Sequence, residues 1–350
     1  MRIAAVASAF PEHYYPQTVL VEALQKYFGE KLANPQRLER IYSHMAVEAR
    51  YLTLPLSAYY GIASWGEAND AFIETAQVLG ERCLCGALAQ AGLDAGEIAT
   101  LIVVSVTGMA SPSIDARLVN RMGLSPRVKR VPIFGLGCVA GAAGIARAAD
   151  YVRAYPGQVA ALLAVELCSL TIQRDDLSIA NLISAALFGD GAAAVLVTGS
   201  DKEAAGPEIL ATRSVFYPHT EHVMGWDISE KGFTIVLSPE VPAMVERHWA
   251  HDVDEFLGDN GLTRKDIGSW ILHSGGPKVL AAMGATLRLP DRALEASWEC
   301  LRRVGNISSV SVLLVLEDVM QHRRPVPGTF GLLGAMGPGF CSELVLLRWS

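Results

Sequence analysis

The chain has 350 residues, 51% of them hydrophobic, and a formal net charge of −7. An acidic balance of this kind gives no bulk attraction to nucleic acid, so a nucleic-acid partner is not expected. The mean hydropathy of +0.28 is high, yet no stretch approaches the roughly 20 uninterrupted apolar residues that a membrane-spanning helix needs. The apolar content therefore indicates strands buried on both faces, together with an oligomer interface.

The cysteines show no regular spacing, so we expect reduced thiols in a cytoplasmic protein rather than a disulfide framework. They are Cys83, Cys85, Cys138, Cys168, Cys300 and Cys341. The apolar run that follows Met1 is too short for a signal peptide and is soon followed by Pro11, so secretion is not expected.

Apolar runs with the length of β-strands alternate with helical segments along the chain. The runs cover residues 2–7, 98–106, 159–167, 192–197, 209–216, 269–273, 329–333 and 342–348. Start signals predict helices at Asn34-Pro35, at Ser111-Pro112 (ending at Gly123) and at Pro239 (ending near Gly258). This alternation predicts an α/β fold with a largely buried mixed sheet.

Several paired features indicate an internal duplication. Residues 188–197 and 334–347 each form a glycine-rich turn that leads into an apolar strand. Cys138 and Asn306 each follow a glycine and precede a helical run of small residues. We therefore predict two similar halves, residues 1–200 and 201–350, with the break near 200–207.

Cys138 lies in a glycine-rich segment that is typical of a tight turn from a strand into a helix. The partial positive charge at a helix N-terminus stabilises a thiolate, so we expect this thiol to have a lowered pKa and to act as a nucleophile. A buried structural cysteine is the alternative. Nucleotide binding is disfavoured, because the spacing from Gly135 is G-x-G-x-x-x-G and not G-x-G-x-x-G.

His273 and Asn306 also lie beside glycines at the ends of predicted elements. His273 ends an apolar strand and precedes a glycine turn, where sites in α/β folds gather. Asn306 can direct an amide N–H at a developing oxyanion. The simpler alternatives are a structural histidine and a helix-capping asparagine.

Together these motifs resemble the type III polyketide synthases, the chalcone synthase group, over essentially the whole chain. The matching segments are Gly137-Cys138, His273-Ser274-Gly275-Gly276-Pro277, Gly305-Asn306-Ile307-Ser308-Ser309, the segment that begins Leu187-Phe188-Gly189-Asp190-Gly191, and Gly337-Pro338-Gly339. The last segment separates this group from fatty-acid initiating ketosynthases, which share the Cys-His-Asn set. The resemblance implies a layered α/β/α/β/α thiolase-like fold and a homodimer.

The resemblance also implies an activity, with CoA thioesters as substrates and no cofactor. Cys138 would hold an acyl group from a starter acyl-CoA, while His273 keeps the thiol ionised. His273 and Asn306 would stabilise the enolate formed when malonyl-CoA loses carbon dioxide, and repeated condensation would end in cyclisation to a pyrone or phenol. Two alternatives stay open: a ketosynthase that condenses once, and a non-catalytic protein that binds acyl-CoA. An acyl carrier protein as donor is also left open.

By the same resemblance, a set of residues lines the substrate pocket, with core packing as the alternative for each. They are Val106, Ser111, Glu166, Cys168, Thr171, Phe188, Trp226, Ser308 and Pro338. Trp226 stands where the plant enzymes have glycine, which argues against a bulky phenylpropanoid starter. Val106 replaces a polar residue or cysteine of relatives that fold a malonyl-only pentaketide, which argues against a naphthalene product. Ser111 stands where plant relatives insert a methionine into the partner's cavity.

Basic side chains are needed to bind polyanionic coenzyme A. Arg37, Arg40 and His44 share one face of a predicted helix and resemble the family's residues at the tunnel mouth; an ordinary solvated face is the alternative. The histidine pairs His219/His222 and His248/His251 have no convincing third ligand, so no metal is expected.

Overall fold

The structure is a computed structural model that describes residues 1–29 and 35–350. Its strands are β1 (Arg2–Ala9), β2 (His13–Pro16), β3 (Ala49–Leu52), β4 (Ile98–Ser105), β5 (Lys129–Phe134), β6 (Val159–Leu167), β7 (Asp190–Thr198), β8 (Glu208–Phe216), β9 (Met224–Ser229), β10 (Gly232–Leu237), β11 (Ile267–Leu272), β12 (Phe330–Gly337) and β13 (Cys341–Arg348). Its α-helices are α1 (Gln17–Phe28), α2 (Pro35–Ser43), α3 (Leu56–Tyr59), α4 (Trp65–Ala91), α5 (Ile114–Met122), α6 (Ala140–Ala154), α7 (Ile179–Leu187), α8 (Val241–Asp259), α9 (Pro277–Leu287), α10 (Glu295–Val304) and α11 (Ser311–Asp318).

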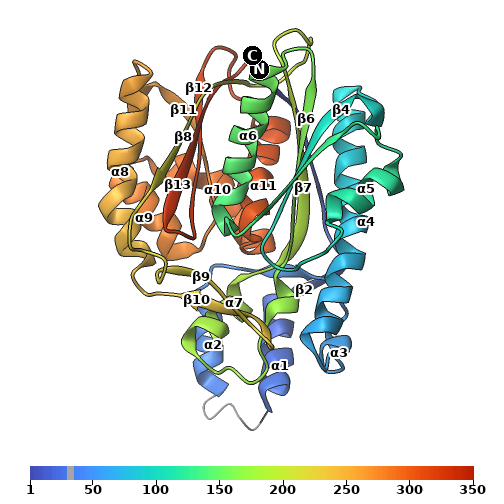
Figure 1. The fold of residues 1–350 in the computed structure, drawn as a ribbon. Helices are drawn as coiled ribbons and strands as arrows, with labels where there is room; N and C mark the ends of the chain where they lie inside the picture. The colour runs from blue at the N-terminus through green and yellow to red at the C-terminus, as the bar shows by residue number, and fades with distance from the viewer. Residues whose placement is uncertain (30–34) are drawn as a thin grey trace.

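Helices and strands form five layers (Figure 1). Helices α8 and α9 cover one outer side, α4 and α5 cover the other, and α6 and α11 lie between the two sheet layers. Three clusters of buried apolar side chains fill the interior: one surrounds the central helices α6 and α11, and one lies beneath the helices of each outer side. The predicted α/β/α/β/α arrangement is therefore confirmed.

Nine strands form one mixed sheet in the order β11-β12-β13-β8-β1-β7-β6-β4-β5. The series β4-β6-β7-β1 pairs parallel, antiparallel and antiparallel, and β11-β12-β13-β8 repeats the same pattern. The two series meet at Arg2, which pairs with Glu208. On either side the Ile3 N–H donates to the Pro207 carbonyl and the Ile209 N–H donates to the Met1 carbonyl. The repeated pattern agrees with the two similar halves expected from the sequence.

The small residues after Cys138 let α6 pack closely in the central layer. A Cβ atom added at Gly141 would lie 2.2 Å from the Ser309 carbonyl oxygen, and one added at Gly144 would lie 2.4 Å from Leu162 Cδ1. These distances are far below van der Waals contact, so both glycines are required. This close packing brings the start of α6 against the segment that follows Asn306.

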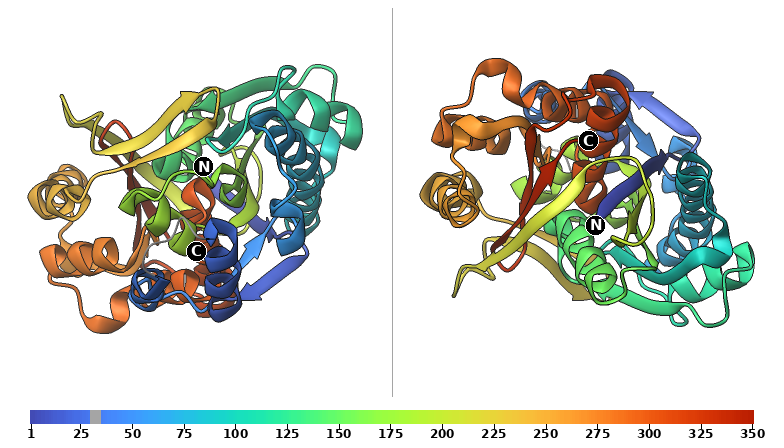
Figure 2. Two further views of the ribbon diagram at one scale, coloured as in Figure 1. Left: turned by 90° about the horizontal axis from the view of Figure 1, so that it is seen from below. Right: turned by 90° about the horizontal axis from the view of Figure 1, so that it is seen from above.

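Short elements gather at one end of the layers, at the bottom of Figure 1. They comprise α1, α2, α3 and α7 with the two-stranded sheets β2–β3 and β9–β10, and Figure 2 shows this end from below. Helix α2 packs against α7, and α7 packs against β10. This end therefore surrounds the approach to Phe188, which directly follows α7.

All eight predicted strand runs overlap strands of the structure, but several boundaries were wrong. Helix α5 begins at Ile114 with Ser113 at its N-cap, not after Ser111, although Gly123 does end it in a left-handed conformation. Helix α8 begins at Val241, and Pro242 rather than Pro239 occupies its first turn. Asn34 lies outside the described residues. Over residues 1–29 and 35–350, no helix has the length and apolar character needed to cross a bilayer.

Candidate active site

Cys138 lies in a short 3₁₀ turn, η3 (Gly137–Val139), that joins β5 to α6. Gly137 has φ +53°, and a Cβ there would lie 2.7 Å from Pro338 Cγ. Only glycine fits this combination of conformation and close approach. Cys138 is therefore fixed just before α6, as the sequence predicted, and the residue before it packs against the predicted pocket residue Pro338.

Asn306 lies on a backbone bridge with Phe188. The Asn306 N–H donates to the Leu187 carbonyl at 2.9 Å, and the Gly189 N–H donates to the Asn306 carbonyl at 2.9 Å. The next turn, η7 (Ser308–Val310), packs against η3. There the Cys138 Sγ contacts the Ser308 hydroxyl at 3.6 Å.

His273 follows β11, and its backbone N–H donates to the Gly334 carbonyl of β12 at 3.0 Å. The Asn306 Nδ2 donates to the Gly275 carbonyl at 3.0 Å, which ties the histidine turn to the asparagine turn. The Asn306 Oδ1 accepts from the Ser308 N–H at 2.8 Å. These bonds bring together the three turns that carry the predicted triad.

The lowered pKa expected for the Cys138 thiol was wrong. Burial raises the pKa of Cys138 to about 11, and the charge of Glu166 adds to this, against hydrogen bonds from Ser308 and Asn306. Burial lowers the pKa of His273 to about 4, and both of its ring nitrogens are buried without a hydrogen-bond partner among the described residues. At pH 7 both groups are neutral, because the cost of desolvation exceeds the effect of the helix N-terminus.

Glu166, near the end of β6, is a fully buried carboxyl group that accepts several hydrogen bonds. It accepts from the Ser105 hydroxyl at 3.3 Å, the Val106 N–H at 3.1 Å, the Thr107 hydroxyl at 2.9 Å and the Ser309 hydroxyl at 2.6 Å. Burial nonetheless raises its pKa to about 7. Glu166 thus joins the segment after β4 to η7 and lies close enough to Cys138 to affect its pKa.

Two other predicted pocket residues lie in the 3₁₀ turn η4 (Cys168–Thr171), where both are buried. The Thr171 hydroxyl donates to the Cys168 carbonyl at 2.8 Å, and Cys138 affects the pKa of Cys168. Trp226 lies on β9 with its ring edge-on to Phe233, 6.1 Å between centroids.

Ser111 is exposed before α5. Within residues 1–29 and 35–350, no hydrogen bond or ring contact joins Trp226 or Ser111 to the three turns of the triad. Their assignment to the pocket stays a prediction.

The predicted coenzyme A residues lie at the end of the molecule formed by the short elements. Arg40 on α2 and His44 just beyond its C-terminus are exposed, and His44 Nδ1 lies 2.6 Å from the Arg40 carbonyl oxygen. Helix α2 is held to α7 by the Tyr42 hydroxyl, which donates to the Ala185 carbonyl at 2.7 Å. The side chain of Arg37 lies outside the described residues.

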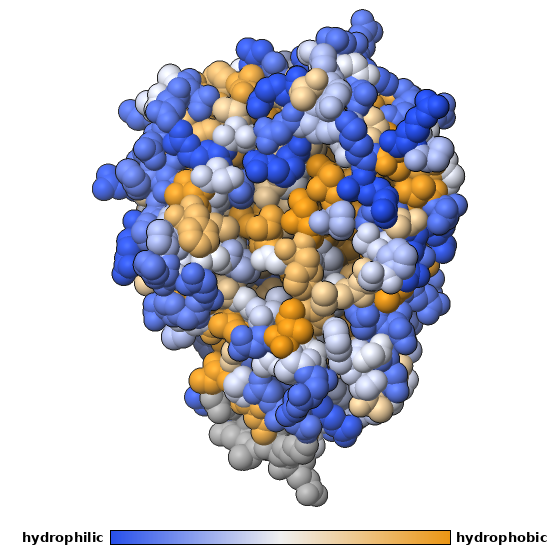
Figure 3. Space-filling model, in the orientation of Figure 1, coloured by the Kyte–Doolittle hydropathy of each residue, from blue (hydrophilic) through white to orange (hydrophobic). Residues whose placement is uncertain are grey.

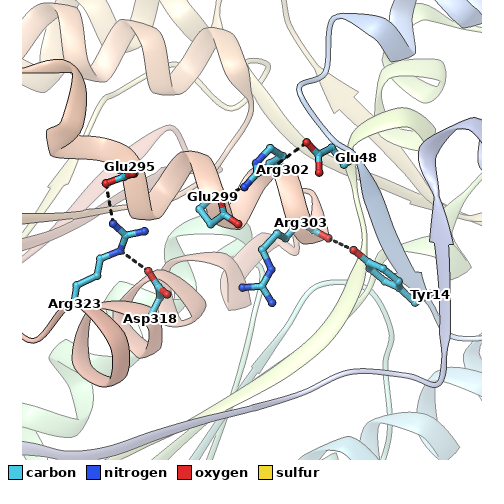
Figure 4. A network of polar contacts seen from close by, with 8 residues as sticks. All are labelled: Tyr14, Glu48, Glu295, Glu299, Arg302, Arg303, Asp318 and Arg323. Carbon is cyan, nitrogen blue, oxygen red and sulfur yellow. Dashed lines mark hydrogen bonds and ion pairs between the residues drawn. The ribbon is translucent and has the colours of Figure 1, made fainter.

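Helix α10 leads directly into Gly305-Asn306, and its C-terminal end is anchored by polar contacts (Figure 4). The Glu48 N–H donates to the Arg302 carbonyl at 2.7 Å, and the Tyr14 hydroxyl donates to the Arg303 carbonyl at 3.0 Å, so two of the four carbonyls at the end of the helix have donors outside it. Arg302 also pairs with Glu48 at 3.2 Å and with Glu299. These ion pairs are solvent-exposed, so water and salt screen them and they contribute little to stability.

Sequence reasoning missed two buried charged residues near the site. Asp190, at the start of β7, accepts hydrogen bonds from the Thr53 N–H and hydroxyl and from the Ser169 N–H, at 2.6, 2.6 and 2.8 Å. Arg50 is 2% exposed and donates to the Phe188 carbonyl at 2.6 Å. The glycines on either side of Asp190 were the available signal for the first; no sequence pattern indicated the second.

Comparison with known proteins supplies the family. Models of the chalcone and stilbene synthases match residues 1–202 (N-terminal domain) and residues 208–349 (C-terminal domain). A 1,3,6,8-tetrahydroxynaphthalene synthase from Streptomyces peucetius subsp. caesius is 51% identical over 99% of this chain and 93% of its own length. A putative chalcone synthase from Bacillus subtilis is 35% identical over 99% of this chain and 98% of its own length.

A solved structure gives the same result. The 1,3,6,8-tetrahydroxynaphthalene synthase of Streptomyces coelicolor A3(2), described as a bacterial type III polyketide synthase, superposes with a TM-score of 0.95 at 31% identity. The match covers 100% of this chain and 99% of that one. The resemblance seen in the sequence and the predicted acyltransferase class are confirmed. The chain belongs to the chalcone and stilbene synthase family and is a type III polyketide synthase.

Proposed function

We propose that Cys138 carries the growing acyl chain as a thioester and that His273 and Asn306 stabilise the enolate of malonyl-CoA. The proposal rests on the hydrogen bonds that hold the turns of Cys138, His273 and Asn306 together. Asn306 is bonded to the histidine turn at Gly275, and η7, which follows Asn306, contacts the Cys138 thiol through Ser308.

The first step is transfer of the acyl group from coenzyme A to Cys138. Because the resting thiol and imidazole are both neutral, the thiol proton passes to His273 as sulfur attacks the thioester carbonyl. The new C–S bond replaces the bond to coenzyme A, and the departing thiolate takes the proton from His273. Proton transfer during attack avoids an isolated buried charge.

The second step is decarboxylation of malonyl-CoA. The bond to the carboxylate breaks, carbon dioxide leaves, and the electron pair forms an enolate whose oxygen needs hydrogen-bond donors. One Asn306 N–H is bonded to Gly275, which leaves the second amide hydrogen for that oxygen. Neutral His273 supplies an N–H as the second donor. The enolate carbon then attacks the acyl carbon on Cys138: a C–C bond forms, the C–S bond to Cys138 breaks, and the departing Cys138 thiolate takes up a proton from solvent.

We propose that Arg40 and His44, with Arg37, bind the phosphates of coenzyme A. Arg40 and His44 are exposed at the end of the molecule formed by the short elements, and the Tyr42 hydroxyl links their helix to α7, which ends beside Phe188. Guanidinium groups suit phosphate. We also propose that the protein acts in the cytoplasm. An acyl carrier protein is a second candidate donor of the acyl group.

We propose that the protein is a homodimer that pairs through the edge strand β5. Strand β5 ends the sheet, and Val131 and Phe134 on it, with nearby Met109, are exposed large apolar residues. Figure 3 shows an apolar zone in the middle of the face on which β5 and the β9–β10 hairpin lie. An unpaired apolar edge is a natural site for association.

For the product, we propose that malonyl-CoA is also the starter, so that five two-carbon units give a naphthalene. The 51% identity to a tetrahydroxynaphthalene synthase supports this, in contrast to the argument from Val106 alone. An acyl-CoA starter with a pyrone or phenolic product is the second candidate, supported by Pks18 of Mycobacterium tuberculosis, an alpha-pyrone synthesis polyketide synthase-like relative that is 30% identical.

Variant kinetics test the proposed roles. Carbon dioxide release from malonyl-CoA is compared in the wild type and in His273→Ala, Asn306→Ala and Cys138→Ala. We expect the first two variants to lose decarboxylation and Cys138→Ala to keep it while losing condensation. Full decarboxylation by Asn306→Ala would overturn its assigned role. Incubation with malonyl-CoA alone distinguishes the two product candidates by the mass of the released product.

A further inference from the structure

Arg50 is a buried cation without a carboxylate partner in the described part of the chain. Its Nη1 donates to the Phe188 carbonyl at 2.6 Å, its Nε donates to Gln17 Oε1 at 3.1 Å, and its Nη2 lies 3.5 Å from the Tyr42 hydroxyl. A buried charge is costly unless it is hydrogen-bonded and faces negative potential. Its environment must therefore supply that potential.

The end of helix α7 supplies it. The last carbonyls of α7 and the one that follows each have a separate donor: the Tyr42 hydroxyl for Ala185, Gln17 Nε2 for Ala186, the Asn306 N–H for Leu187 and Arg50 for Phe188. A helix C-terminus carries partial negative charge, which a cation stabilises. Arg50 thus completes a cap, and it also contacts two of the other donors, Gln17 and Tyr42.

This cap directly supports the bridge that carries Asn306. A Cβ added at Gly305 would lie 3.0 Å from Arg50 Cδ and 2.5 Å from the Leu187 carbonyl oxygen. A Cβ added at Gly189 would lie 3.6 Å from Arg50 Cβ and 2.6 Å from the Val304 carbonyl oxygen. The backbone on both sides of the Phe188–Asn306 bridge therefore packs against the stem of Arg50 and has no spare room.

We infer that Arg50 is a positioning residue for the side-chain amide of Asn306 and for Phe188; this rests on the role proposed above for Asn306. Without the bond to the Phe188 carbonyl, the bridge can shift relative to the histidine turn. An error of about 1 Å in the placement of a reacting group can cost about 100-fold in rate. Acylation of Cys138 depends less on this bridge, because η3 is also fixed by the close approach of Gly137 to Pro338.

The inference predicts that the two half-reactions separate in Arg50→Met, which has a side chain of similar length and no donors. Decarboxylation is measured as acetyl-CoA formed from malonyl-CoA in the Cys138→Ala background. Acylation is measured by intact mass with Cys138 present. We expect kcat for decarboxylation to fall about 10- to 100-fold, acylation to stay within about 3-fold, and Arg50→Lys to recover part of the loss. Arg153→Met, an exposed arginine paired with Asp150 on α6, is the matched control.

Equal loss of both half-reactions would show a purely structural role and overturn the inference, as would no loss in either. If Arg50→Met is not recovered folded, Arg50→Lys carries the test. Lysine keeps the charge but lacks the guanidinium fork that reaches Phe188 and Gln17 together. We therefore expect Arg50→Lys to lose decarboxylation more than acylation as well, but by a smaller factor. Asn306→Ala in the same assay distinguishes the two proposals. If it decarboxylates normally, the proposed function fails, whereas a loss there with no loss in Arg50→Met removes only the role of Arg50.

Discussion

The Asn306 amide donates a 3.0 Å hydrogen bond to the carbonyl oxygen of Gly275, two residues beyond His273. The bond fixes the spacing between the two side chains proposed to hold the enolate. Asn306→Asp replaces the donor with a charged acceptor that faces this carbonyl, and it places negative charge where the enolate forms. We expect kcat for malonyl-CoA decarboxylation to fall at least about 100-fold, as measured by release of labelled carbon dioxide. A loss under tenfold would contradict the account.

The reactivity of the resting thiol is expected to increase steeply with pH. Burial raises the pKa of Cys138 to about 11, and alkylation proceeds through the thiolate. The rate of iodoacetamide labelling, followed by intact mass, should therefore rise through pH 8 and 9 without a plateau. Ser308→Ala removes a hydrogen bond that lowers this pKa, so it should slow labelling at pH 8.5. A plateau below pH 7 would show a stable thiolate.

Glu166 should make stability depend on pH. Burial raises its pKa to about 7, so the folded state binds more protons than the unfolded state between about pH 4.5 and 7. The stability that this group contributes is fully present below its unfolded pKa and is lost as pH rises through 7, on the order of 3 kcal/mol. The free energy of unfolding of Glu166→Gln minus that of the wild type, measured by urea denaturation, should therefore increase from pH 5 to pH 8. Exposed Glu246→Gln is the control and should show no such trend.

Differences in packing predict opposite effects on stability for alanine substitution of two glycines, Gly144 on α6 and Gly258 on α8. Gly144→Ala places a Cβ 2.4 Å from Leu162, and overpacking of this kind costs about 1–3 kcal/mol. Gly258→Ala, near the end of α8 with open space around it, should instead stabilise by about 0.5–1 kcal/mol. Thermal unfolding monitored by circular dichroism compares them. A stabilised Gly144→Ala would show that the core at Leu162 can relax.

The edge strand β5 predicts a site at which charge disrupts assembly. Val131→Glu places a carboxylate in the proposed contact between two copies, so sedimentation at micromolar concentration should show monomers. Val326→Glu is the control, because Val326 is 70% exposed and lies away from β5 in sequence. A dimeric Val131→Glu, or a wild-type monomer, would remove β5 from the interface.

The three turns that carry the proposed triad could be predicted because each residue lies beside glycines whose backbone conformation is needed locally. Arg50 could not, because its partners Phe188 and Gln17 are 138 and 33 residues away, and a single arginine in a mixed segment looks like a surface residue. Strand β5 was missed because Pro132 and two basic residues interrupt its apolar pattern. An edge strand tolerates such residues.

The sign of the shift in the Cys138 pKa also could not be predicted from the sequence. The helix N-terminus is a local feature that the sequence reveals. The desolvation that exceeds it comes from η7 and β12, which are distant in the chain and pack against η3. Burial of this kind is set by tertiary structure alone.

Intact-protein mass spectrometry with peptide mapping, after incubation with malonyl-CoA alone and with a panel of starter acyl-CoA esters, tests the central claim most directly. The account predicts acyl adducts on Cys138 that are absent in Cys138→Ala, with released products that contain several two-carbon units. Adducts on another residue, or products formed by Cys138→Ala, would contradict it.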